Sequence, residues 1–207
     1  MGNLLEAKVS VRGTRPLFWH WFGPDALPLE KQEREGVPGN DPSEWRRTTL
    51  CTKDGHLYLE PSYVFGAMRD GSKYTKRGRA SIQKNVCATL QCTDNRIFVD
   101  RWLPGFPNDH VCDLATVESP EQDPEAMVYL DIRGVRNPST KGRNVRYRVA
   151  ASEGWTCEFH LLWDKTIVSR GEMEAVIIDA GKLVGLGNGR AIGMGRFEVL
   201  EFTVTDG

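Results

Sequence analysis

Alternating apolar and polar residues along the chain predict several half-buried strands. In residues 4–13, Ala7, Val9 and Val11 alternate with polar neighbours, which is the period-two pattern of a strand with one buried face. The other β-rich stretches are a predicted hairpin over residues 46–60 and predicted strands over residues 96–102, 127–137, 143–164 and 194–204.

Three other stretches have the apolar spacing of helices. Pro61 suits the first turn of a helix over residues 61–70, because the N–H that proline lacks would have no partner there. Ser169 and Glu172 have the spacing of a capping box, which predicts the start of a helix over residues 170–184. A further helix is predicted over residues 80–91.

The order of these elements predicts the fold class. Without irregular segments the chain reads strand, helix, strand, strand, helix, strand, and this βαββαβ order predicts an α+β protein with a ferredoxin-like or RRM-like core. Two stretches rich in proline and acidic residues, about residues 14–45 and 103–126, are predicted to be long insertions. We therefore expect a single domain over residues 1–207 that carries both insertions.

Positive charge is segregated along a chain that is nearly neutral as a whole. The net charge of −1 argues against a general polyanion binder. Residues 69–84 nevertheless contain six bases and one acid, and residues 133–148 contain six bases and no acid. Such runs are either solvated surfaces or places where local cations neutralise phosphates.

The five cysteines are odd in number and irregular in spacing, which predicts free thiols in a reducing cytosol. One zinc site stays open as an alternative, because Cys87, Cys92, His110 and Cys112 supply four nitrogen or sulfur ligands at a non-standard spacing.

The chain lacks an apolar run of about 20 residues and a signal-peptide pattern. We expect a cytoplasmic protein without a membrane partner, a metal or a cofactor.

Residues 185–197 combine five glycines with two arginines and no acid. A nucleotide-binding phosphate loop is disfavoured, because such a loop follows a strand and precedes a helix, and this segment has the reverse order. A structural hinge remains possible. The third interpretation is a bare backbone surface that a nucleic-acid strand approaches closely, with Arg190 and Arg196 facing phosphates.

The same segment resembles the C-terminal glycine-rich signature of the RAMP superfamily, the RNA-binding proteins of CRISPR effector complexes. The matching positions are Gly185, Gly187, Gly189, Arg190, Gly193, Gly195, Arg196 and Phe197.

Residues 57–70 are similar to a second family motif, the Pro-Gly-Ser-Ser-x-x-Gly-x-x-Arg run. Its matching positions are Pro61, Ser62, Gly66 and Arg69, and Tyr63 replaces a small residue. The resemblance is good over residues 57–70 and 155–204 and weak over the two insertions.

A single domain with a long insertion after its first strand looks most like the repeating backbone subunit of these complexes. The resemblance implies that copies of the chain form a filament along the guide RNA (crRNA) beside other CRISPR effector subunits. It also implies that the filament presents the guide to a target RNA or single-stranded DNA, and that one insertion acts as a thumb between nucleotides. Trp19, His20 and Trp21 suit a thumb in residues 14–45, and they suit packing against the core equally well.

We expect the guide RNA to contact basic, aromatic and glycine residues of these segments. Unpaired bases stack on aromatic rings with about 1–3 kcal/mol per base. The expected RNA-binding residues are Arg46, Arg47, Tyr63, Arg69, Lys73, Tyr74, Lys76, Arg77, Arg136, Arg143, Gly187, Gly189, Arg190, Gly193 and Arg196.

The alternative function is that of a RAMP-type endoribonuclease, for guide processing or target cleavage. Guide-processing members move a 2′-hydroxyl proton, often with a histidine, and His20 is the best candidate here. Some backbone subunits cut target RNA with an aspartate after the first strand, and Asp25 and Asp41 lie in that insertion. Guide-processing nucleases usually carry two ferredoxin-like domains, so the binding subunit is the favoured interpretation. An RNA-recognition module outside CRISPR is disfavoured, because residues 131–137 and 146–152 carry arginines where stacking rings are expected.

Overall fold

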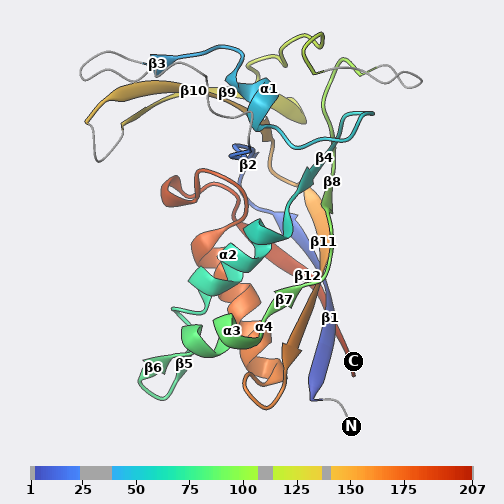
Figure 1. Ribbon diagram of the computed structural model, residues 1–207, viewed down its shortest axis with the longest axis vertical. Coiled ribbons are helices and arrows are strands. Elements are labelled where there is room, and N and C mark those ends of the chain that lie inside the picture. The colour runs from blue at the N-terminus through green and yellow to red at the C-terminus, as the bar shows by residue number, and fades with distance from the viewer. Residues whose placement is uncertain (1–2, 24–38, 107–113, 137–140, 207) are drawn as a thin grey trace. The chain divides into compact units, whose positions relative to one another are not determined.

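The computed structural model describes residues 3–23, 39–106, 114–136 and 141–206 (Figure 1). The chain divides into two compact units. The first unit contains residues 1–17, 58–100 and 153–207, and the second contains residues 18–57 and 101–152. Each unit is described by itself below. Among the described residues, no helix is long and apolar enough to cross a membrane.

The first unit is built on an antiparallel sheet with the strand order of a ferredoxin-like core. The order is β12-β1-β11-β8-β4, and β7 also pairs with β11. The strands are β1 (Leu4–Gly13), β4 (His56–Leu59), β7 (Gln91–Cys92), β8 (Ile97–Trp102), β11 (Thr156–Asp164) and β12 (Phe197–Asp206). The predicted α+β class with a ferredoxin-like core is confirmed.

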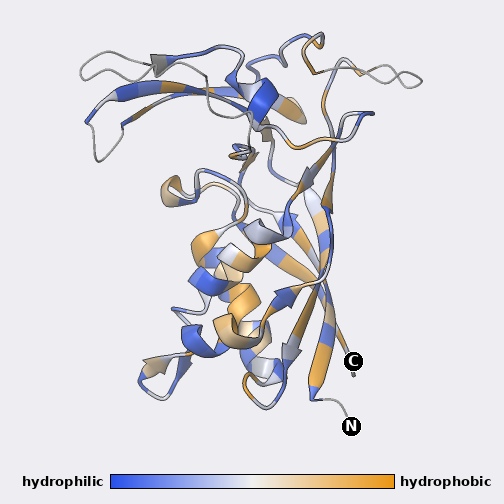
Figure 2. Cartoon of the chain, viewed as in Figure 1, coloured by the Kyte–Doolittle hydropathy of each residue, from blue (hydrophilic) through white to orange (hydrophobic). Residues whose placement is uncertain are grey.

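The helices of the first unit lie on one side of this sheet (Figure 1). They are α2 (Pro61–Gly71), α3 (Gln83–Thr89) and α4 (Arg170–Asp179), and α4 continues as a π-helical segment over Ala180–Val184. Val64 and Met68 of α2 and Val176 of α4 are fully buried, together with alternate residues of β1 and β11. Orange and blue segments accordingly alternate along α2, α4 and the strands, as expected for elements with one buried face (Figure 2). The other faces of the strands carry ion pairs such as Lys8 with Glu158.

The predicted capping box is present at the start of α4. The Ser169 hydroxyl accepts a hydrogen bond from the Glu172 amide, and the Glu172 carboxylate accepts one from the Ser169 amide. The guanidinium of Arg77, in strand β5 (Lys76–Arg77), donates two hydrogen bonds to the same carboxylate, at 2.7 and 2.8 Å. These hydrogen bonds, with that of Arg77 the largest cause, lower the pKa of Glu172 to about 2. The charged form of Glu172 therefore ties α4 to β5.

The second unit contains a small sheet with the order β2-β10-β3, in which β9 also pairs with β10. Its elements are β2 (Leu17–Phe18), β3 (Gly39–Asn40), α1 (Glu44–Thr48), β9 (Val128–Arg136) and β10 (Arg143–Ala151). Trp19 and Trp45 are fully buried in its core. The antiparallel ribbon of β9 and β10 runs from the pair Val128 and Ala151 to the pair Arg136 and Arg143.

Two stretches differ from the strand predictions. The stretch 143–164 is two strands in two sheets, β10 and β11, and the break between them contains Gly154 with a φ of +86°. In the stretch 46–60, Arg46 and Arg47 lie in helix α1, and the hairpin is reduced to one bridge between Cys51 and Leu57, a residue of β4.

The physical reason for the helix is tertiary packing. Trp45 is fully buried, and the Glu44 carboxylate accepts hydrogen bonds from Arg146 and from the Tyr147 amide. The hydroxyls of Thr48 and Thr49 donate to the carbonyls of Glu44 and Trp45, four residues earlier. Such bonds do not themselves stabilise a helix, and β-branched residues usually favour strands, so burial of Trp45 and the contacts of Glu44 outweigh the local preference. The predicted helix over residues 80–91 is also shorter, because Ala80 and Ser81 form strand β6 and pair with β5 around Gly78.

The glycine-rich segment, called the glycine loop here (residues 185–195), closes on itself. The Leu186 amide donates to the Gly195 carbonyl at 2.8 Å, and the Gly195 amide donates to the Pro16 carbonyl at 2.7 Å. A Cβ atom on Gly195 would lie 1.9 Å from the Leu186 carbonyl oxygen, and the φ of Gly195 is +69°. Gly195 is therefore required because the two backbone segments touch. From the sequence, the glycines are expected to expose backbone to a nucleic acid. At Gly195 the missing side chain instead makes room for the backbone of Leu186.

We expect Gly195→Ala to lower the free energy of unfolding by about 3 kcal/mol or more. The substitution adds left-handed backbone strain of about 1–2 kcal/mol and a clash that opens the loop. Gly193→Ala is the matched control, because Gly193 also has a positive φ, +84°, but its Cβ would meet no atom within 4 Å. We expect Gly193→Ala to cost only the strain. Urea denaturation of both variants measures the difference, and equal losses would contradict the backbone-contact explanation.

Candidate nucleic-acid interface

A concave site of about 680 Å³ lies on the first unit, between α2, the turn that follows it and the glycine loop. It combines hydroxyl, amide, aromatic, cationic and glycine positions. The lining residues are Ser62, Tyr63, Gly66, Asp70, Lys73, Tyr74, Leu183, Val184, Gly187, Asn188, Gly189, Arg190 and Ala191. Six of the residues that the sequence predicted for RNA binding are brought together here: Tyr63, Lys73, Tyr74, Gly187, Gly189 and Arg190.

One face of α2 packs in the core and another face lines the site, in line with the helical spacing of its residues. Val64, Ala67 and Met68 are fully buried. Residues 63, 66 and 70 recur at helical spacing and line the site. A Cβ atom on Gly71 would lie 2.8 Å from Ala180, so glycine at this position lets α2 pack closely on the extension of α4. This packing brings α2 beside the chain that leads into the glycine loop.

The glycine loop presents Arg190 to the site. Gly187 and Gly189 have φ angles of +67° and +74°, which L residues with side chains rarely adopt. A single 3-10 turn, Arg190–Ile192, follows them. A Cβ atom on Gly66 would lie 3.8 Å from the Nη1 atom of Arg190, so the arginine lies close to the backbone of α2.

The carboxylate of Asp70 is the common partner of the cations at this site. Its Oδ1 accepts a hydrogen bond from Lys73 Nζ at 2.9 Å, and Arg69 contacts both of its oxygens at 3.2 Å. Arg190 Nη1 reaches Oδ2 at 3.4 Å. Burial opposes ionisation of Asp70, but the hydrogen bonds from Arg69 and Lys73 outweigh it and lower the pKa of the carboxyl. Asp70 is therefore ionised, and the cluster as a whole is cationic.

Two tyrosines of the site have different surroundings. Tyr63 lines the site and is half-buried, and this burial raises the pKa of its hydroxyl to about 12, so the hydroxyl stays protonated. Tyr74 is 53% exposed and borders the site beside Lys73. An exposed ring beside cations suits stacking of an unpaired base whose phosphate is held nearby.

The remaining predicted residues of the first unit lie outside this lining. Arg69 is exposed and reaches the site only through Asp70. Arg77 is bound to Glu172, and Lys76 is exposed. Burial lowers the pKa of Arg196, which lies near Tyr74, and its Nη1 atom has no hydrogen-bond partner among the described residues. Gly193 belongs to the glycine loop but does not line the site.

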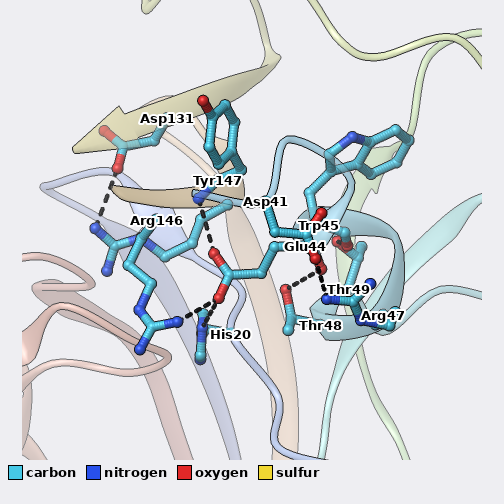
Figure 3. Close-up of polar contacts among 11 residues, drawn as sticks. His20, Asp41, Glu44, Trp45, Arg47, Thr48, Thr49, Asp131, Arg146 and Tyr147 are labelled. Carbon is cyan, nitrogen blue, oxygen red and sulfur yellow. Dashed lines mark hydrogen bonds and ion pairs between the residues drawn. The ribbon is translucent and has the colours of Figure 1, made fainter. Parts of the chain in front are cut away.

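The second basic run lies in the second unit and is partly neutralised there. Arg133 and Arg148 contact the buried carboxylate of Asp131. Arg146 contacts the buried carboxylate of Glu44 (Figure 3). Arg136 and Arg143 are exposed and lie directly opposite each other in the ribbon of β9 and β10. Opposed like charges destabilise a strand pair unless an anion compensates them.

The two arginines at residues 46 and 47 act within the second unit. Arg46 donates to the carbonyls of Leu114 and Val117 and lies 4.4 Å from the ring centre of Trp45. Arg47 forms an ion pair with Asp41 (Figure 3). These contacts attach α1 to its surroundings, so the structure gives both side chains a role in the fold.

The catalytic candidates that the structure describes are engaged in the same network. His20 Nε2 lies 3.1 Å from Glu44 Oε1, and Glu44 also accepts hydrogen bonds from Arg146 and from the Tyr147 amide (Figure 3). Asp41 is held by Arg47 and by the amide and hydroxyl of Ser43. Asp25 lies outside the described residues.

The zinc candidates are only partly described. Cys87 is exposed, and burial raises the pKa of Cys92 to about 12. His110 and Cys112 lie outside the described residues. Within the described ranges, no group of three or more histidine, cysteine, aspartate or glutamate side chains is arranged to hold a metal ion.

Comparisons with known proteins place limits on identity. No protein-family model and no curated protein matches the chain. In structure, the chain is similar to a chain of the cryo-EM structure of the Type III-B Cmr-beta bound to cognate target RNA, with a TM-score of 0.45 and 12% sequence identity. The match covers 98% of this chain and 61% of that chain, so this chain spans less than two thirds of the length of the chain it matches.

Proposed function

We propose that the chain binds guide RNA as a backbone subunit of a CRISPR ribonucleoprotein effector complex. The observation that carries the proposal is the concave site, where α2 and the glycine loop place Tyr74, Lys73 and Arg190 around one cavity. Cations neutralise phosphates and an exposed ring stacks on a base, which together suit single-stranded RNA. The two motifs that resemble the RAMP superfamily fall on these same two elements.

The exposed end of the β9 and β10 ribbon is a second surface for the same ligand. Arg136 and Arg143 are paired directly across the two strands there. A phosphate close to both guanidinium groups would relieve their repulsion, so we assign this end to contacts with the RNA backbone.

The resemblance supplies the finer part of the proposal. Copies of the chain assemble along the guide, other effector subunits complete the particle, and the guide pairs with a target RNA or single-stranded DNA. The proposal is binding and presentation of RNA, and it gives the described candidates His20 and Asp41 a role in the fold of the second unit through Glu44 and Arg47.

Arg190→Ala and Tyr74→Ala test the site by two different measures. We expect Arg190→Ala to weaken binding of a labelled single-stranded RNA about tenfold, because a charge-assisted hydrogen bond contributes about 1.5–3 kcal/mol. It should also lower the slope of log K against log salt by roughly 0.7, the value for one phosphate contact. Tyr74→Ala should weaken binding by about 1–3 kcal/mol without changing the slope, because stacking involves no counterion.

Fluorescence anisotropy over a salt series measures both quantities. Tyr74→Phe keeps the ring and should bind like the unchanged protein. Lys8→Ala removes one cation from the opposite face of the sheet, where Lys8 pairs with Glu158, and should have little effect. Unchanged affinity in both Arg190→Ala and Tyr74→Ala would place RNA binding elsewhere.

For the ribbon of β9 and β10 we expect one double substitution to lower RNA affinity without lowering the free energy of unfolding. Replacing Arg136 and Arg143 together with alanine removes two opposed charges, so the free energy of unfolding should stay equal or rise. RNA affinity should fall. Arg146→Ala is the contrasting variant, because it leaves the buried Glu44 without one of its partners and should destabilise the unit. Thermal unfolding and fluorescence anisotropy on the same samples measure both quantities. A double variant that keeps full RNA affinity would show that the ribbon does not contact the RNA.

Assembly on a guide is tested by expressing the chain with and without a CRISPR array. We expect a multimer that contains RNA of regular length only when the array is present, and RNase should reduce its mass in light scattering. A monomer free of nucleic acid under both conditions would contradict the backbone-subunit proposal.

A further inference from the structure

Asp70 joins cations that come from separate parts of the chain. Arg69 and Lys73 belong to α2 and the turn after it, whereas Arg190 is 120 positions away in the glycine loop. The carboxylate contacts all three, at 3.2, 2.9 and 3.4 Å. The contact between Asp70 and Arg190 therefore links the loop to the helix by a pair of opposite charges.

Without the carboxylate these three cations would repel one another. Long basic side chains also lose conformational freedom when they are ordered, and a ligand that must order them binds less tightly. Asp70 reduces both costs, because it attracts Arg190 towards the cations of α2 before any ligand arrives. The cluster remains cationic, since one acid faces three bases.

The exposure of the four side chains indicates what a phosphate would meet first. The side chain of Asp70 is 21% exposed, while those of Arg69, Lys73 and Arg190 are 46%, 52% and 33% exposed. The acid thus lies deeper than the bases, and its own repulsion of a phosphate is screened by them. Arginine carries five N–H donors, so one bond from Nη1 to Asp70 leaves it able to bind a phosphate as well.

We infer that Asp70 is a positioning residue for RNA binding, which holds Arg190 and Lys73 in the arrangement that receives a phosphate. This inference rests on the proposed function, because it concerns the same concave site. It assigns a favourable role to an acid in a site for a polyanion. Simple electrostatics predicts the opposite, because removal of a negative charge should strengthen the attraction of RNA.

Asp70→Asn separates these two expectations by sign. If Asp70 positions the cations, Asp70→Asn should bind the labelled single-stranded RNA about five- to tenfold more weakly and with a smaller salt slope, because fewer cations reach phosphates. Asp70→Glu keeps the charge and should recover most of the affinity. Glu174→Gln is the matched control, since it removes an exposed acid of α4 outside the site and should leave affinity unchanged or slightly higher. Thermal unfolding of each variant shows whether it is folded.

A double-mutant cycle with Arg190→Ala identifies the route of the effect. If Asp70 acts through Arg190, the loss caused by Asp70→Asn should shrink or change sign once Arg190 is alanine. Affinity in Asp70→Asn equal to or above that of the unchanged protein would overturn the inference and leave the proposed function intact. An unchanged protein that fails to bind RNA would overturn both.

Discussion

The concave site depends on a backbone contact that only glycine permits. The Leu186 amide and the Gly195 carbonyl are joined at 2.8 Å, and a Cβ atom on Gly195 would lie 1.9 Å from the Leu186 oxygen. Closing the loop at its base leaves residues 187–193 as a short projecting segment. Its left-handed glycines at 189 and 193 bracket one turn, which carries Arg190 towards α2. A loop that could not close would leave Arg190 without a fixed position.

Much of the first unit could be predicted from the sequence because its signals are local. The pattern of residues 4–13 matches β1 at both ends, Pro61 begins α2, and Ser169 with Glu172 begins α4. Helix α1 could not be predicted in the same way. Its threonines favour strands by composition, and the helix is stabilised by burial of Trp45 and by the contacts of Glu44 with Arg146 and Tyr147, which lie far along the chain.

The candidate site shows the same division between local and distant signals. Arg190 and the glycines around it stand out in the sequence, and the tyrosines lie among bases. Asp70 does not stand out, because a charge count treats it as a lone acid within a basic run. Its contact with Arg190 joins residues 120 positions apart, and no periodicity or motif within one sequence reports such a pair.

The acids also explain why two similar basic runs differ in their capacity to bind phosphate. Glu44 and Asp131 have side chains only 8% and 6% exposed. An arginine that left such a partner for a phosphate would abandon a buried carboxylate, and this is strongly unfavourable. Arg190 meets no such obstacle, because its single bond from Nη1 to Asp70 leaves its other N–H donors for a phosphate. The cations around Asp70 are therefore available to a ligand, whereas most of those on β9 and β10 are committed to the fold.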